Sequence, residues 1–172
     1  DIPAEAAGAA VQPLQLNVKA GDEVMVQVAK SPIGSKGARL SMCLSFVGKN
    51  VILLPLADFC AVSRKITDEE LRAQLMKQAE KLVGGDGGVV MRTNAPNVKF
   101  TDLKEEVKYL RGLYAEALEA YKNASVGDLV YRDADVHVRL LRDFDLSDVD
   151  KIYIGDDKSY QRVEAAFRRT RS

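Results

Sequence analysis

The spacing of the apolar residues changes once along this chain, at Thr67, and this change limits the folds that are possible. In residues 23–46 apolar and polar residues largely alternate, which is the two-residue period of a half-buried strand. Residues 51–54 are apolar throughout, as in a buried strand. After Thr67 the apolar residues recur every three or four positions, as they do on one face of a helix. Strands followed by helices predict an α+β fold.

Three strands are expected first, at residues 23–30, 38–46 and 51–54. Three strands in succession favour an antiparallel sheet or a small barrel. Thr67 and Glu70 have the spacing of a capping box and predict the start of a helix that ends at Gly84. A short strand at residues 89–91 and a long helix capped by Thr101 are expected to follow.

The last third of the chain predicts an alternation of strands and helices. The expected strands are residues 129–131 and 151–154, and the expected helices are residues 134–142 and 158–169. This order implies a parallel pair of strands with crossover helices. Residues 1–19 are rich in alanine and lack an apolar period, so they are expected to form an arm or a loop.

Charge and apolar runs exclude several classes of protein. Twenty-five basic residues balance twenty-five acidic ones, so a nucleic acid would be held by a local patch and not by the overall charge. The apolar run at residues 51–57 is far shorter than the roughly 20 residues of a membrane-spanning helix. Cys43 and Cys60 lack the spacing of a zinc site, which favours free thiols and a cytoplasmic protein.

Three patterns resemble catalytic or metal-binding motifs but fail on inspection. The glycine-rich tract at residues 84–88 precedes a strand, whereas phosphate-binding loops follow a strand and open a helix. The acidic run at residues 143–150 has Asp148 where a calcium loop needs glycine, and Ile154 where it needs a carboxylate. His137 has no companion ligands or nucleophile nearby in the sequence. No covalent catalysis is therefore expected from these residues.

Three basic clusters stand out from the otherwise mixed charge, at residues 36–39, 64–65 and 92–93. Arg92 and Thr93 follow a predicted strand, where a guanidinium and a hydroxyl together suit a phosphate group. On composition alone, each cluster is more often an ordinary charged surface than a binding site.

Five segments resemble the bacterial ribonuclease E/G family in their order and spacing. They read GSKGARLS, VSRKI, VVMRT, RLLRD and DKIYI, at residues 34–41, 62–66, 89–93, 139–143 and 150–154. The resemblance extends from about residue 20 to residue 168. It implies an endoribonuclease that cuts single-stranded RNA and is assembled from an OB-fold RNA-binding domain, a 5′-end sensor, a ribonuclease H-like subdomain and a catalytic domain.

The resemblance also implies how this chain is divided. Residues 1–19 would be a flexible arm, and residues 20–65 part of an OB-type antiparallel β-barrel. Residues 66–125 would be the α/β 5′-sensor, and residues 126–172 a partial ribonuclease H-like α/β layer.

Carried over position by position, the resemblance implies two sets of site residues. Those that match the 5′-monophosphate pocket are Arg92, Thr93, Gly48 and Ile52, the last through its backbone amide. Those that match RNA contacts are Lys36, Arg64 and Lys65. Many members have arginine at the position of Lys65, and a lysine there keeps the charge but loses the planar fork.

The implied partner is single-stranded RNA with a 5′-monophosphate end. The family's magnesium ion is held by two aspartates that are expected beyond this chain, so no metal, cofactor or catalytic residue is assigned within it. The longer parent enzyme is expected to be a homo-oligomer. Two other classes stay open at this stage, a non-catalytic RNA-binding module and a structural oligomerisation segment.

Overall fold

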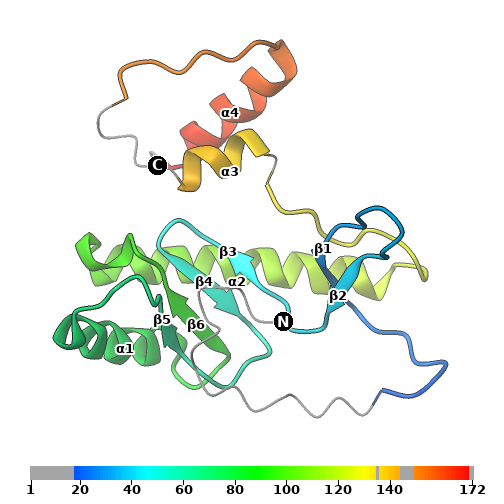
Figure 1. The fold of residues 1–172 in the computed structure, drawn as a ribbon, viewed down its shortest axis with the longest axis horizontal. Coiled ribbons are helices and arrows are strands. Elements are labelled where there is room, and N and C mark those ends of the chain that lie inside the picture. Colours follow the sequence, from blue (N-terminus) through cyan, green and yellow to red (C-terminus); the bar gives the residue numbers. More distant parts are fainter. Residues whose placement is uncertain (1–17, 135, 144–148, 171–172) are drawn as a thin grey trace. The chain divides into compact units, whose positions relative to one another are not determined.

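The computed structural model describes residues 18–134, 136–143 and 149–170. The chain divides into two compact units, Asp1–Tyr131 and Arg132–Ser172 (Figure 1). Most of the predicted arm at residues 1–19, and residues 144–148 of the acidic run, lie outside the described residues.

The first unit contains six strands, two α-helices and one 3-10 helix among its described residues. The strands are β1 (Gln27–Lys30), β2 (Arg39–Ser41), β3 (Phe46–Val47), β4 (Val51–Leu54), β5 (Ala61–Val62) and β6 (Gly88–Met91). The helices are α1 (Glu69–Val83), η1 (Ala95–Asn97) and α2 (Phe100–Lys122). In the second unit the described helices are α3 (Val136–Asp143) and α4 (Asp157–Thr170).

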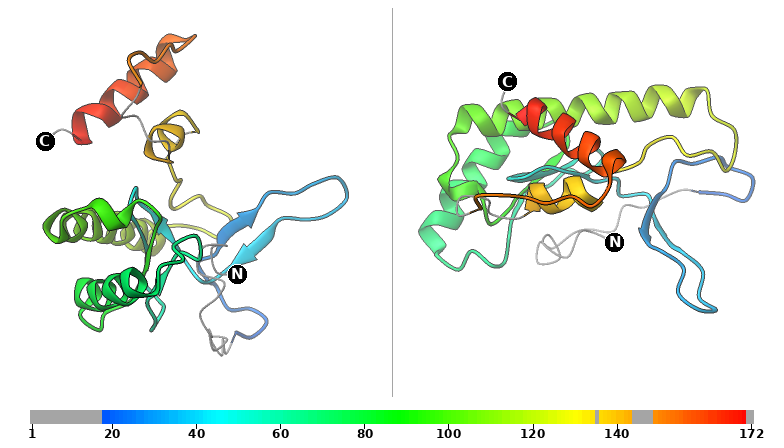
Figure 2. Two further views of the ribbon diagram at one scale, coloured as in Figure 1. Left: turned by 60° about the vertical axis from the view of Figure 1, so that its left-hand side comes forward. Right: turned by 90° about the horizontal axis from the view of Figure 1, so that it is seen from above.

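The first unit has two separate sheets. β1 and β2 form an antiparallel pair, and the other four strands form a mixed sheet in the order β3-β4-β6-β5. Within this sheet β5 and β6 are parallel, while β4 is antiparallel to both of its neighbours. Helices α1 and α2 contact each other and lie on one face of the sheet (Figure 2). The α+β prediction is therefore confirmed.

The strand β4 is buried on both faces, which explains its continuous apolar sequence. Val51 and Leu53 belong to the main core, which also contains Leu75 of α1 and Leu103 and Leu110 of α2. On the other face a second cluster contains Ile52, Leu54, Ala57, Ala61 and Val90. Burial of large aliphatic side chains at about 1.5–3 kcal/mol each makes this sheet the main source of stability.

The predicted strand at residues 38–46 is interrupted in the structure. Its first part is β2, which pairs with β1, and its last residue begins β3, which pairs with β4. Between these two parts, side-chain oxygens accept the hydrogen bonds of two backbone amides. Gln27 Oε1 accepts the Ser45 amide proton (2.8 Å), and Ser41 Oγ accepts the Cys43 amide proton (3.1 Å). The strands form open sheets, and the described residues contain no closed barrel.

Both predicted helix starts are displaced. The N-cap of α1 is Asp68 and not Thr67, and its Oδ1 accepts the Leu71 amide proton at 3.0 Å. The second long helix begins at Phe100, and its Lys99 cap makes no side-chain hydrogen bond. The predicted end of α1 is confirmed, since Gly84 adopts the left-handed conformation with φ of 61°.

The two strands predicted in the last third are wrong. Residues 129–131 and 151–154 are described but adopt no strand structure, so the expected parallel pair is not formed. Leu129 and Tyr153 are well exposed, at 68% and 87%. A short apolar run becomes a strand only where a neighbouring strand accepts its hydrogen bonds. The two predicted helices are present as α3 and α4.

The described residues form no helix with both the length and the apolar character that crossing a membrane requires.

Candidate functional site

The sheet topology brings two of the predicted basic clusters to one end. Because β5 and β6 are parallel, Arg64 and Lys65 after β5 and Arg92 after β6 leave the sheet at the same end. The turn between β3 and β4, which carries Lys49, lies there as well, because β4 is antiparallel to β6. With neighbouring strands about 4.8 Å apart, the backbone positions of these four cations fall within about 15 Å along the end of the sheet. We call Lys49, Arg64, Lys65 and Arg92 the cationic sheet end.

Arg92 is fastened to the β3–β4 turn. Its Nη1 donates to the carbonyl oxygens of Gly48 at 2.7 Å and Lys49 at 3.4 Å. Its backbone amide donates to Asn50 O at 2.8 Å, which extends the β4–β6 pairing by one residue. The side chain is half-buried, and the adjacent Thr93 is exposed. The guanidinium is thus held in place, and the next residue along the chain is accessible.

Glu106 of α2 also holds the β3–β4 turn. Its Oε1 accepts the backbone amide proton of Asn50 at 2.9 Å, and its Oε2 accepts from Asn50 Nδ2 at 2.8 Å. A Cβ atom on Gly48 would clash with Glu106 Oε1, so a larger residue at position 48 would force the carboxylate away from its present place. Glu106 was not predicted as a site residue, because no local motif marks a contact across 56 residues.

Arg64 and Lys65 lie exposed at the tip of a tight turn. The Ser63 amide donates to Met91 O at 2.8 Å, and the Ile66 amide closes the turn on Ser63 O at 3.1 Å. Arg72 of α1 braces this turn, since its Nη1 donates to Ser63 O (2.8 Å) and Ile66 O (2.9 Å). Sequence reasoning did not identify this role of Arg72.

Replacing Arg72 with alanine is expected to destabilise the first unit by roughly 1.5–3 kcal/mol, because two buried carbonyls lose a charged donor. Urea unfolding followed by circular dichroism measures this change. The matched control is Lys77→Ala, an exposed residue of the same helix, which is expected to change stability by less than about 0.5 kcal/mol. Equal stabilities of the two variants would contradict the bracing role.

Two other predicted residues lie elsewhere. Lys36 is exposed in the connection between β1 and β2, where it forms an isolated bridge with Ile33, and it is not part of the cationic sheet end. Ile52 is buried in β4 opposite Val90. In an antiparallel sheet, the backbone groups of every second residue in a strand point to the same neighbouring strand. Asn50 O accepts the amide proton of Arg92, the residue after β6, so the Ile52 amide, two residues further on, also points toward β6. Its predicted contact with phosphate stays a prediction.

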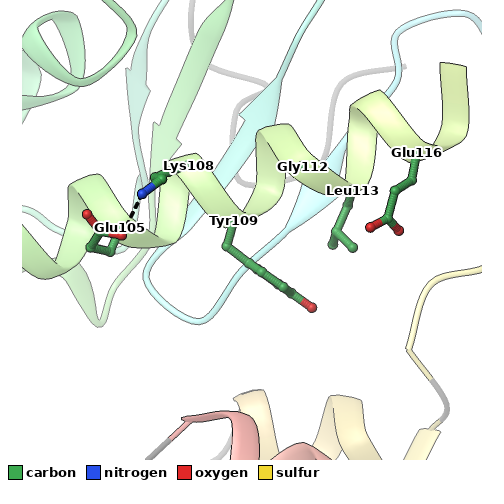
Figure 3. A pocket seen from close by; sticks show the side chains of 6 residues that line it. All are labelled: Glu105, Lys108, Tyr109, Gly112, Leu113 and Glu116. Carbon is green, nitrogen blue, oxygen red and sulfur yellow. Dashed lines mark ion pairs between the residues drawn. The ribbon is translucent and has the colours of Figure 1, made fainter. Parts of the chain in front are cut away.

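One side of α2 carries a shallow depression (Figure 3). Tyr109, Gly112 and Leu113 line it, together with Glu105, Lys108 and Glu116. The Lys108 ammonium lies 3.6 Å from Glu105. With two carboxylates against one ammonium, this surface is a poor site for a phosphate.

The two cysteines of the first unit are not activated thiols. Cys43 and Cys60 are half-buried free thiols, and burial raises the pKa of each. A raised thiol pKa lowers the fraction of reactive thiolate at neutral pH. Within the described part of the chain, no three His, Cys, Asp or Glu side chains gather as a metal site would require.

The first unit is therefore an α+β domain with a cationic sheet end suited to phosphate groups. A sequence model of the ribonuclease E/G family matches residues 45–172. The chain belongs to the ribonuclease E/G family.

Individual relatives agree with this assignment. The chain is 31% identical over 146 residues to "Ribonuclease G" of Salmonella typhimurium, and 29% identical over 147 residues to that of Haemophilus influenzae. It is 30% identical over 141 residues to "Ribonuclease E" of Synechocystis. The matches cover 85%, 86% and 82% of this chain, but only 30%, 30% and 21% of these relatives. The chain thus spans less than a third of their length.

Proposed function

We propose that this chain is the RNA-binding and 5′-monophosphate-sensing part of an endoribonuclease. The observation that carries the proposal is the Arg92 guanidinium, held on Gly48 O at 2.7 Å beside the exposed Thr93. A fixed guanidinium forms charge-assisted hydrogen bonds to phosphate oxygens at little cost in side-chain entropy.

The chemistry of the RNA end explains why such a site would prefer it. An internal phosphodiester carries one charge and is esterified on both sides. A 5′-monophosphate offers three terminal oxygens and up to two charges. Arg92 and Thr93 would bind this end, and Lys49, Arg64 and Lys65 would contact the following phosphates.

The remaining family features are part of the same proposal. Residues 20–65 with Lys36 would belong to an OB-type RNA-binding domain, residues 66–125 to the 5′-sensor, and residues 126–172 to a ribonuclease H-like layer. The four-stranded sheet includes strands from both sides of residue 66, so the first two parts would form one folded body. Cleavage with magnesium and assembly into a homo-oligomer are proposed for the longer protein.

The experiment that tests the proposal compares two single-stranded RNAs of one sequence, with a 5′-monophosphate or a 5′-hydroxyl. The 172-residue chain is expected to bind the monophosphorylated RNA at least about tenfold more tightly, the minimum ratio that one charge-assisted bond supplies. Affinity is expected to fall with salt at a log–log slope of about −0.7 per neutralised phosphate. Equal affinity for the two ends would contradict 5′-sensing, and salt-independent binding would contradict the cationic contact.

The chain by itself is expected to leave single-stranded RNA intact when magnesium is added. Hydrolysis of a phosphodiester by a metal ion requires ligands that place the ion and its water, and we assign none here. Gel electrophoresis of end-labelled RNA after incubation with magnesium measures this. Cleavage that EDTA abolishes, and that co-purifies with the folded chain through several columns, would overturn the expectation.

A further inference from the structure

We infer that Glu106 is a positioning residue that sets the 5′-end preference by holding the β3–β4 turn against Arg92. This inference rests on the proposed function of Arg92. Glu106 lies within α2, which begins at Phe100, and has no expected contact with RNA, so its effect would pass through the turn.

The turn is held by two different elements. Arg92 and Asn94, which follow β6, donate to its carbonyl oxygens, with Arg92 N on Asn50 O at 2.8 Å and Asn94 Nδ2 on Lys49 O at 3.4 Å. The Glu106 carboxylate of α2 accepts hydrogen bonds from the backbone amide and from the side-chain amide of Asn50. Hydrogen bonds to a charged acceptor are about twice as strong as neutral ones, so the carboxylate is the firmer anchor.

The consequence for Arg92 follows from the geometry. Its guanidinium is oriented by the carbonyl of Gly48, and Gly48 is two residues from the Asn50 amide that Glu106 holds. Without the carboxylate, the Asn50 amide loses its partner and the turn samples other conformations. Arg92 then loses a fixed acceptor and must be ordered when phosphate binds, which weakens binding of the RNA end.

The same geometry gives Gly48 a specific reason to be glycine. A Cβ atom there would clash with Glu106 at 2.1 Å and press on Val51 O at 3.0 Å. The glycine makes room for the carboxylate from α2, in addition to any role it has toward RNA. Gly48 and Glu106 therefore act as one unit.

Three variants of the 172-residue chain test the inference with the paired RNAs. Glu106→Ala is expected to lower the ratio of affinities for 5′-monophosphate over 5′-hydroxyl RNA at least threefold, with the affinity for 5′-hydroxyl RNA unchanged within twofold. Glu106→Gln is expected to retain most of the ratio, because its amide can still pair with a flipped Asn50 side chain. Glu105→Ala, the adjacent exposed residue of α2, is the control and is expected to behave as wild type.

A double variant separates positioning from a general loss of structure. If Glu106 acts through Arg92, then Arg92→Ala with Glu106→Ala has the same ratio as Arg92→Ala alone. A wild-type ratio in folded Glu106→Ala overturns the inference alone. If the alanine variant does not fold, loss of the ratio in Glu106→Gln with an unchanged Asn50 amide exchange rate overturns it instead, because the turn would then still be held. Equal binding of both RNA ends by the wild-type chain overturns the proposed function and this inference with it.

Discussion

Replacing Arg92 with alanine is expected to remove at least tenfold of the preference for 5′-monophosphate over 5′-hydroxyl RNA. One charge-assisted hydrogen bond to a phosphate contributes roughly 1.5–3 kcal/mol, which corresponds to about 10- to 150-fold in affinity. The substitution also removes the donor that holds Gly48 O, so the pocket loses its cation and its order together. Fluorescence anisotropy with the two RNAs measures the ratio directly.

Control variants distinguish binding of the RNA's 5′ end from binding of the rest of the strand. Thr93→Val is expected to lower the ratio less than Arg92→Ala, because it removes one neutral hydroxyl and keeps the shape. Lys36→Ala, away from the cationic sheet end, is expected to weaken both RNAs about equally. Arg92→Lys keeps the charge but not the fork, and is expected to retain only part of the preference. An Arg92→Ala variant that is folded and keeps the wild-type ratio would contradict the assignment of Arg92.

Replacing Gly88 with alanine is expected to destabilise the first unit by on the order of 3 kcal/mol, as severe overpacking does. Gly88 is buried at the start of β6, opposite Leu54 of β4. An added Cβ atom would lie 2.1 Å from Phe59 O and 3.2 Å from Ala57 Cβ. A backbone carbonyl cannot rotate away as a side chain does, so either the 57–59 segment or the end of β6 must move. Urea unfolding followed by circular dichroism measures the loss.

The matched control is the same substitution at Gly112 of α2. An added Cβ atom there meets nothing within 4 Å, and the residue is exposed in the helix interior. Alanine is favoured over glycine in a helix by about 1 kcal/mol, so Gly112→Ala is expected to stabilise the chain. If Gly88→Ala is as stable as wild type while Gly112→Ala raises stability, the packing described around Gly88 is wrong.

Local sequence patterns predicted the structure correctly where the spacing of apolar residues in a segment matched the face that the segment buries in the fold. The apolar run that became β4 and the helical stripe through Leu75 and Ala79 of α1 were both recognised correctly, since burial on a sheet or a helix face leaves a direct trace in the sequence. Gly84 marked the end of α1 because a left-handed residue there favours glycine. The same rules failed at residues 151–154, whose alternating apolar residues have no neighbouring strand among the described residues.

The sequence by itself determined the α+β class, the family and the basic residues that became candidates, because period, composition and motif order are local properties of the chain. Only the tertiary structure decided which candidates lie together. The parallel pairing of β5 with β6 places Arg64 and Lys65 at the same sheet end as Arg92, while Lys36 lies in the connection between β1 and β2, which form a separate sheet. Glu106 reaches Asn50 across 56 residues, and no pattern within either segment encodes that contact. It arises because α2 packs across β3 and β4, and such a crossing depends on the whole core and not on local spacing.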